Sequence, residues 1–426
     1  MINKMFDFLS LSCKVCKSFG LLLSVFAFGS CFRSSPVNAI YHPSFTEEGD
    51  LVDSIAYFES SMPSSVQLYV EASGSMNGFF RSNKVTAFKA DVWSIFSNFK
   101  PLANGIYVFE NGRTPRQVLL DNFQTYMNQG KFLSAYSTQV PEMVESILSQ
   151  LNPERGEVAV LVSDMKYSPT GRKDMQVRVS QYASDIRNTV NRYPISLSLI
   201  AAYSQFLDKK GNSICDCSPY YFLVMGKAKY VTRMRNHIAT MLSQFGHYAG
   251  SIDMGMEYQQ PQFTLSRIDN ALLLDKQPTL YGIDTEYNDT CSFTIQADVK
   301  DYPWGMIDGE VFKKCLKVKM TEGSTCLIDT VTFDVDNTVD KMLNRRATAM
   351  IRVKVTDMIA AADVMEWSLD IPDHVGLENF QPFMGAQSEN EVNKTYSLEG
   401  FLQGCNSVKS NFCGKQPNRI LLSKNE

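Results

Sequence analysis

The feature that most constrains the fold is the alternation of strand-like and helix-like segments between about residues 64 and 250. The strand-like segments are short apolar runs, and residues 158–162 (Val-Ala-Val-Leu-Val) contain no polar side chain at all. Such a run is typical of a parallel strand that is covered on both faces. Helix-like segments such as residues 84–99 repeat apolar side chains at the spacing of one helix face. The alternation predicts an α/β domain built on a doubly wound, mostly parallel sheet.

The expected elements of this domain follow from these periods. We expect strands at residues 66–70, 105–109, 158–162, 195–202 and 220–225, and helices at residues 84–99, 140–151, 174–193 and 230–245. The domain as a whole is predicted to span residues 63–250.

A different pattern begins beyond residue 260, where short β-rich segments follow one another without helices. They lie at residues 291–299, 315–320, 327–335, 348–355 and 367–371. This spacing predicts a smaller all-β domain, an Ig-like sandwich, over residues 260–372. The change of period between about residues 250 and 278 predicts a junction with few contacts across it. Residues 373–426 form a tail that packs on either domain or trails.

The most informative segment for function lies at the end of the first predicted strand. Residues 66–78 read Val-Gln-Leu-Tyr-Val-Glu-Ala-Ser-Gly-Ser-Met-Asn-Gly. Glu71 ends the apolar run, and Ser73 and Ser75 follow it, so three oxygen-bearing side chains lie within five residues. In open α/β sheets, ligands bind at the carboxyl ends of the strands. Carboxylate and hydroxyl oxygens together suit a hard cation such as Mg²⁺.

This segment resembles the metal-ion-dependent adhesion site of von Willebrand factor A-like domains, whose first motif is Asp-x-Ser-x-Ser. Two further features follow in the order of that family. Thr138 lies just before the predicted helix at residues 140–151, and Asp164 follows the strand at residues 158–162. The resemblance covers about residues 64–250, which is under half of the chain.

The resemblance implies one divalent cation, Mg²⁺ with Mn²⁺ or Ca²⁺ as alternatives, in a site formed by five residues. Ser73 and Ser75 would bind the ion directly, Thr138 directly or through water, and Glu71 and Asp164 mainly through water. Hydroxyl ligands leave the charge of the ion incompletely neutralised. The family uses the open coordination position to capture a carboxylate from a partner protein.

Two positions leave the ligand set open. Glu71 stands where the family has aspartate, and its additional methylene adds a C–C bond of about 1.5 Å. The longer side chain could bind the ion directly, neutralise its charge or prevent binding. Without a metal, Ser73 and Ser75 would only cap the following turn and helix. Ser137 is the alternative to Thr138, which we favour because it lies nearer the start of the next helix.

The first 30 residues are predicted to be an export signal. Three lysines precede an apolar run, residues 19–30, that is too short to span a bilayer. The run ends at Gly-Ser-Cys, which resembles a bacterial lipobox with Cys31 as the lipidated residue. Residues 31–62 would then tether the protein to the cell envelope, and we expect the outer membrane. The alternative is cleavage after Ala39, which would release a soluble product.

Composition and cysteine content limit the other functions. The net charge of −4 and the lack of basic clusters make nucleic acid a poor candidate partner. An exported chain can form disulfides, and Cys405 with Cys413 is the best local pair. Cys215 and Cys217 are interpreted as loop cysteines, because no second Cys/His pair lies near them to complete a metal site.

Three functions remain. The first is binding, in adhesion or envelope assembly, to a protein that offers a carboxylate to the metal. The second is a structural envelope lipoprotein with a degenerate, metal-free site. The third is an envelope hydrolase with Ser73 as nucleophile, but the chain has only four histidines, none in a catalytic motif, and lacks the Gly-x-Ser-x-Gly elbow. We therefore expect a binding protein and not an enzyme.

Lipidation at Cys31 is directly testable. Replacing Cys31→Ala removes the thiol that would carry the lipid, so the protein should remain unprocessed or move from the membrane to the soluble fraction. Mass spectrometry of the mature N-terminus makes the measurement. A mature chain that starts at Ile40 would instead establish ordinary secretory cleavage.

Overall fold

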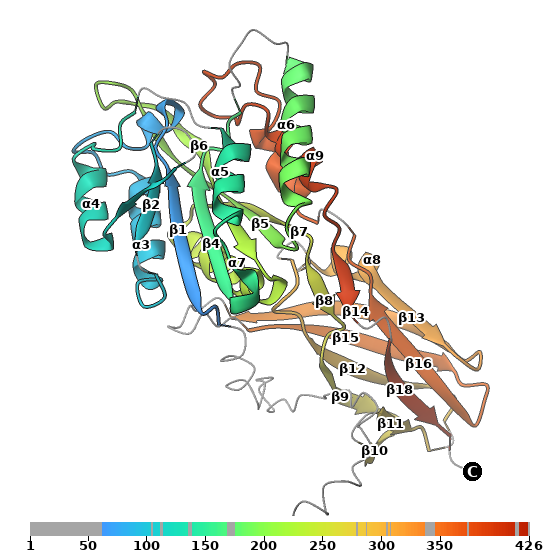
Figure 1. Cartoon of the computed structure of the whole chain (residues 1–426). Coiled ribbons are helices and arrows are strands. Elements are labelled where there is room, and N and C mark those ends of the chain that lie inside the picture. The colour runs from blue at the N-terminus through green and yellow to red at the C-terminus, as the bar shows by residue number, and fades with distance from the viewer. Residues whose placement is uncertain are drawn as a thin grey trace, which may run out of the picture.

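The computed structural model describes residues 62–424, except residues 104, 111–113, 135–138, 168–174, 278–279, 287, 304–305, 307, 337–345, 373–374 and 414–416. The predicted leader, Cys31 and nearly all of the tether therefore lie outside the described residues, as do Ser137 and Thr138. No helix of the described part is long and apolar enough to cross a membrane. The chain forms an α/β body and a β sandwich (Figure 1).

A seven-stranded sheet forms the centre of the α/β body. Its strands are β1 (Ser65–Glu71), β2 (Ile106–Phe109), β3 (Arg116–Val118), β4 (Glu157–Ser163), β5 (Ser196–Leu207), β6 (Ser213–Gly226) and β7 (Tyr248–Met254), in the order β3-β2-β1-β4-β6-β5-β7. The predicted α/β class is confirmed. Parallel pairing is confined to β2, β1 and β4. The other pairs of this sheet are antiparallel. For β5 and β6 the reason is the short loop that joins them, because a short connection permits only antiparallel pairing.

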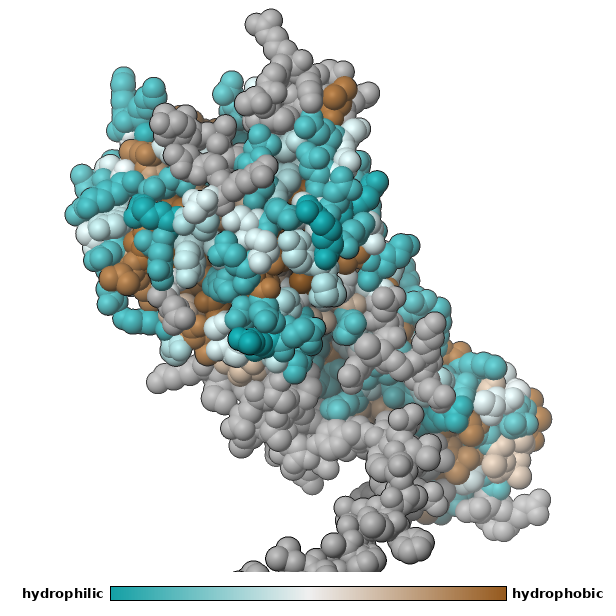
Figure 2. Space-filling model, viewed as in Figure 1, coloured by the Kyte–Doolittle hydropathy of each residue, from teal (hydrophilic) through white to brown (hydrophobic). Residues whose placement is uncertain are grey.

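Helices cover both faces of this sheet. On one face lie α3 (Ala87–Asn98), α4 (Leu120–Asn128) and α7 (Ala228–Phe245), and on the other α5 (Val140–Leu148), α6 (Met175–Val190) and the C-terminal α9 (Leu398–Cys405). Successive residues of a strand point to opposite faces, so Leu68 packs into the first layer and Tyr69 into the second. Two buried faces explain why these strands have apolar runs without alternation. The solvent-facing sides of α5 and α6 are mostly hydrophilic (Figure 2).

The C-terminal segment packs on the α/β body, although it follows the sandwich in sequence. Helix α9 lies beside α6 (Figure 1). Gly400 and Gly404 permit the close approach, because a Cβ at either would lie only 2.7 or 2.8 Å from a carbonyl oxygen of α6. Before α9, Phe380 in the 3₁₀ helix η4 (Leu377–Phe383) stacks on Tyr221 of β6 with ring centroids 6.2 Å apart. The tail is thus part of the core.

The sandwich consists of two sheets. One has the order β14-β15-β12-β9, with β9 (Phe263–Asp269), β12 (Cys291–Asp298), β14 (Thr325–Asp336) and β15 (Arg346–Asp357). The other has the order β10-β11-β18-β16-β13, with β10 (Leu272–Gln277), β11 (Leu280–Asp284), β13 (Leu316–Met320), β16 (Ala362–Leu369) and β18 (Asn418–Ser423). The last strand, β18, pairs between β11 and β16. The all-β region predicted from residues 260–372 therefore also takes a central strand from the end of the chain.

A short helix and a pair of short strands complete this half of the molecule. Helix α8 (Gly309–Cys315) precedes β13, and β8 (Glu257–Gln259) pairs in parallel with β17 (Asn411–Cys413). The β8–β17 pair lies on the two connections between the bodies, so the outgoing and returning chains are hydrogen-bonded to each other.

A buried arginine ties the two bodies together. Arg235 of α7 is inaccessible to solvent and donates to the carbonyl oxygens of Tyr302, at 2.6 Å, and Asp301, at 3.0 Å. Its guanidinium also lies 3.3 Å from the carboxylate of Asp253 in β7. The neighbouring Asn236 donates to the carbonyl of Lys300 at 2.8 Å. The prediction of a junction with few contacts is therefore wrong, because the buried side chains of Arg235 and Asn236 make three hydrogen bonds across it.

The predicted disulfide between Cys405 and Cys413 is also wrong. Cys405 is a free thiol on the buried side of α9, in the layer between α9 and the sheet. Its burial raises the pKa of the thiol well above its usual value. Cys413 ends β17, which pairs with β8 elsewhere in the fold. Cys215 and Cys217 are free as well, and both lie in β6 near its hairpin.

The close packing of α9 on α6 predicts the effect of a single methyl group. In an open helix, Gly→Ala stabilises by about 1 kcal/mol. A Cβ at residue 404 would lie 2.8 Å from the carbonyl oxygen of Ala183 and from the Cβ of Ile186, so Gly404→Ala should instead lower the free energy of unfolding by about 1–3 kcal/mol. Urea denaturation makes the measurement. Gln403→Ala, at an exposed position of the same helix, is the control, and equal stabilities of the two variants would contradict the packing argument.

Candidate functional site

The candidate site lies where β1 and β4 end side by side. The two strands pair in parallel, with Val70 opposite Val162, so Glu71 and Ser163 end neighbouring strands. The 3₁₀ helix η1 (Gly74–Gly78) begins three residues after Glu71. This is the edge at which the sequence places the predicted ligands, and the parallel register brings the ends of both strands to it.

Glu71 is buried and held by its neighbour on β4. The hydroxyl of Ser163 donates to Oε2 of Glu71 at 2.5 Å, and the same hydroxyl accepts from the backbone N–H of Met165 at 2.8 Å. Hydrogen bonds to an ionised acceptor are short and strong. Met165 has a positive φ of 55°, an uncommon conformation for a residue with a long side chain. The carboxylate of Glu71 is therefore fixed against the end of β4.

The hydroxyl groups of Ser73 and Ser75 are hydrogen-bonded to each other, with their oxygens 2.9 Å apart. Octahedral Mg²⁺ binds oxygen at about 2.0–2.1 Å, so two adjacent ligands lie about 2.9 Å apart. The serine pair thus already has the separation that two neighbouring ligands require. Ser73 occupies the N-cap position of η1, but its side chain forms no capping hydrogen bond with that helix.

Asp164 has one carboxylate oxygen without a partner. The side chain is buried, and its Oδ1 accepts from the backbone N–H of Lys166 at 3.1 Å. Its Oδ2 is fully enclosed and has no hydrogen-bond partner among the residues that the structure describes. A buried, unpaired carboxylate oxygen is costly, and a proton, a water molecule or a cation would satisfy it.

The two carboxylates lie within electrostatic reach of one buried phenol. Burial is the main reason that the pKa of Tyr182 is raised well above its usual value. The negative charges of Glu71 and Asp164 raise that pKa further. Because both act on the same phenol, they concentrate negative charge at this end of the sheet.

The C-terminal segment forms part of the wall of the site. The hydroxyl of Thr395 donates to the carbonyl oxygen of Asp164 at 3.3 Å and lies 2.9 Å from the hydroxyl of Tyr221. The backbone N–H of Tyr167 donates to the carbonyl of Tyr396 at 3.3 Å. These contacts join residues more than 170 positions apart, so no local sequence pattern could have placed Thr395 here.

Four of the five predicted ligands are thus placed at one edge of the sheet. Glu71, Ser73, Ser75 and Asp164 follow the ends of neighbouring strands, and Thr138 lies outside the described residues. The described part of the chain contains no group of three or more His, Cys, Asp or Glu side chains that could hold a metal ion. A metal at this edge would therefore depend on the serine hydroxyls.

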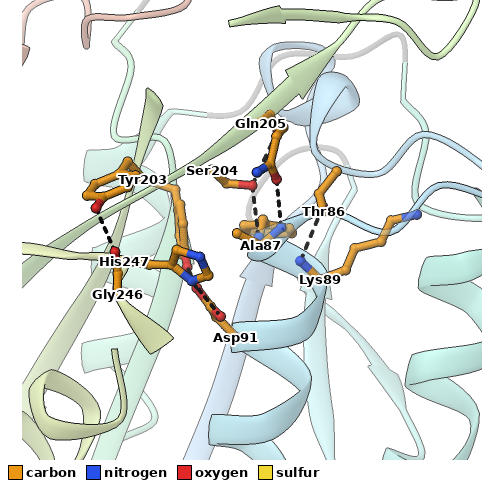
Figure 3. Close-up of polar contacts among 11 residues, drawn as sticks. Thr86, Ala87, Lys89, Asp91, Tyr203, Ser204, Gln205, Gly246 and His247 are labelled. Carbon is orange, nitrogen blue, oxygen red and sulfur yellow. Dashed lines mark hydrogen bonds and ion pairs between the residues drawn. The ribbon is translucent and has the colours of Figure 1, made fainter. Parts of the chain in front are cut away.

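A second buried carboxylate, that of Asp91, lies on α3 against the opposite face of the sheet, and Figure 3 shows its contact with His247. Asp91 of α3 accepts from the hydroxyl of Tyr220 at 2.7 Å, and its Oδ2 lies 2.8 Å from Nδ1 of His247. Tyr203 contacts the same imidazole with its ring. Burial raises the pKa of Asp91, and the bond from Tyr220 and the charge of His247 partly counter that effect. No local sequence pattern pairs His247 with Asp91, because the two residues are 156 positions apart.

The N-terminus of α3 is capped from β5 (Figure 3). Ser204 Oγ accepts from the N–H of Phe88 and Gln205 Oε1 from that of Ala87, both at 2.9 Å. The N-cap residue Thr86 accepts from the N–H of Lys89 at 3.4 Å. These bonds satisfy helix donors that would otherwise be unpaired. The hydroxyl of Ser204, the serine next to Tyr203 in sequence, thus caps the N-terminus of α3.

No family model, curated protein or solved structure matches the chain. The geometry of the described residues is therefore the basis for the functional interpretation.

The raised pKa of Asp91 predicts a pH-dependent stability. A carboxyl whose folded pKa lies above its unfolded value stabilises the fold most at low pH and loses this contribution as the pH rises through the folded pKa. The stability of the native protein relative to Asp91→Asn should therefore fall as the pH rises from 3.8 upward, by about 1.4 kcal/mol per unit of pKa difference. Urea unfolding of both proteins between pH 4 and 7 tests this, and a constant difference would contradict it.

Proposed function

We propose that the protein is an exported, lipid-anchored binding protein of the cell envelope, with its α/β body acting as a von Willebrand A-like domain. In this proposal the site at the end of β1 and β4 binds one divalent cation and captures a carboxylate from a protein partner, in adhesion or envelope assembly. The observation that carries the proposal is the unpaired buried oxygen of Asp164 at the same sheet edge as the Ser73–Ser75 hydroxyl pair.

The fold is compatible with this proposal. Three parallel strands, β2, β1 and β4, lie between two layers of helices, and the residues in question follow the carboxyl ends of β1 and β4. Open α/β sheets bind ligands at this position. The sandwich would then be an Ig-like domain attached to the binding body, and Cys31 would anchor the chain to the membrane.

Each side chain would have its own role in binding the ion. Ser73 and Ser75 would bind the ion directly, since their oxygens already have the spacing of adjacent ligands. Asp164 would orient a metal-bound water through Oδ2, and Thr138 would complete the set. Ser163 fixes Glu71, which supports an orienting role for this residue. A bound Mg²⁺ would supply a Lewis-acidic position for the carboxylate of the partner.

One observation favours a second candidate, a structural lipoprotein with no metal. The carboxylate of Glu71 is already satisfied by Ser163, and Thr395 closes on the backbone of Asp164. In such a scaffold, the C-terminal segment would simply seal this edge of the sheet. An envelope hydrolase has no comparable support, because no serine among the described residues hydrogen-bonds to His247.

Metal-linked stability separates the two candidates. A ligand that binds only the folded state stabilises it by about 2.7 kcal/mol at a hundred times its Kd. The native protein should therefore melt at a higher temperature in millimolar Mg²⁺ or Mn²⁺, and Ser73→Ala should lose this response. Without metal, Ser73→Ala should change the free energy of unfolding by about 1 kcal/mol or less. Calorimetry with both ions makes the measurement.

Two further variants sharpen this experiment. Ser149→Ala, at an exposed position after α5, should keep the full metal response. Glu71→Asp should tighten binding if the additional methylene is a defect, and weaken it if glutamate itself is a ligand. No heat and no shift in melting temperature for the native protein would leave only the scaffold.

A further inference from the structure

A separate polar site lies on the outward face of the four-stranded sheet of the sandwich. An open pocket of about 520 Å³ is lined by side chains from all four strands. Its residues include Arg267, Thr294, Thr330, Thr332, Met350 and Arg352. The alternate residues of these strands, among them Phe293 and Ile351, are buried in the core, so the pocket side is the outer face.

Arg352 is held rigidly in this pocket. One terminal nitrogen donates to Thr294 Oγ1 at 3.3 Å and to the carbonyl oxygen of Arg267. The other donates to Ser292 Oγ at 2.5 Å and to the carboxylate of Asp269. Asp269 thus balances the charge of Arg352, and the bonds fix the planar guanidinium before any ligand arrives.

No other residue that the structure describes balances the charge of Arg267. Its side chain is exposed, and its guanidinium forms no hydrogen bond or ion pair with any other described residue. Its backbone has a positive φ of 48° and lies where the pairing of β12 with β9 shifts register. Such strained residues cluster at functional sites. Within the described part of the chain, the pocket therefore has one unpaired positive charge.

Hydroxyl groups supply the rest of the pocket. The side chains of Thr330 and Thr332 form no hydrogen bond with the part of the chain that the structure describes. On β9, Ser266 lies opposite Thr294 and has an enclosed hydroxyl without a described partner. A hydroxyl can donate and accept, so this face can pair with ligand hydroxyl groups in either sense.

We propose that this pocket binds an acidic saccharide, with the carboxylate of a uronic acid unit on Arg267 and sugar hydroxyls on Thr330 and Thr332. Guanidinium pairs with a carboxylate in a planar, bidentate fashion. An acidic peptide fits this position less well, because an extended peptide binds at a sheet edge, where backbone groups are open, and this pocket spans the face. The site lies on the sandwich and does not depend on the proposed metal site.

The test is a titration of the full chain with tri-galacturonate, followed by calorimetry. Maltotriose, a neutral trisaccharide, and a glutamate-rich tripeptide serve as the comparison ligands. The native protein should bind tri-galacturonate at millimolar concentration or below, and at least tenfold more tightly than either of them. Arg267→Gln should weaken binding at least tenfold, as expected for the loss of a charged hydrogen bond. Thr332→Val, which keeps the shape and removes the hydroxyl, should weaken it about threefold or more.

Arg419→Gln is the matched control, because Arg419 lies on β18 in the other sheet and its loss changes the net charge equally. It should bind tri-galacturonate as the native protein does. Thermal melting confirms that each variant is folded. Absence of binding at 10 mM, equal affinity for maltotriose or for the tripeptide, or undiminished binding by folded Arg267→Gln would each overturn the proposal.

Discussion

The structure depends on one constraint, the need to bury both faces of the central sheet. Apolar side chains project from β1 and β4 on both sides, so each face requires its own layer of helices. One layer is local in sequence, with α3, α4 and α7. The other takes α9 from the end of the chain, and Leu398 and Phe401 complete the core there. The α/β body is therefore completed by a helix that follows most of the sandwich strands in sequence.

Because the chain returns to the α/β body, the two bodies are linked by more than one connection. The segment that carries α9 leaves β16, crosses to the α/β body and comes back as β18 between β11 and β16. The segment that carries α9 thus belongs to the α/β body, although sandwich strands precede and follow it in sequence. Arg235, buried between them with Asp253 and two carbonyl groups, adds a polar bond that is costly to break. The two bodies are expected to unfold together.

The same return shapes the candidate site. Thr395 bonds to the backbone of Asp164, and the nearby Lys166 donates to the carbonyl oxygen of Glu391 at 3.0 Å. The C-terminal segment thus stiffens the loop that carries Asp164. Rigid placement of a few oxygens is what a metal site requires. Ser73 and Ser75 are held together by their mutual hydrogen bond, and Oδ2 of Asp164 is left without a partner among the described residues.

The amino-acid pattern was enough to predict many of the elements and the edge of the candidate site, but not β3, α4 or β7. Hydrophobic period is a local property, so it predicted β1, β4 and α7, and the positions of Glu71 and Asp164 at strand ends. Only the tertiary structure decided the antiparallel half of the sheet, the place of α9 and the insertion of β18. The same holds for the partners Asp91 and Thr395, which meet His247 and Asp164 from 156 and 231 positions away. Pairing across such distances is set by packing of the whole chain, and a local pattern does not encode it.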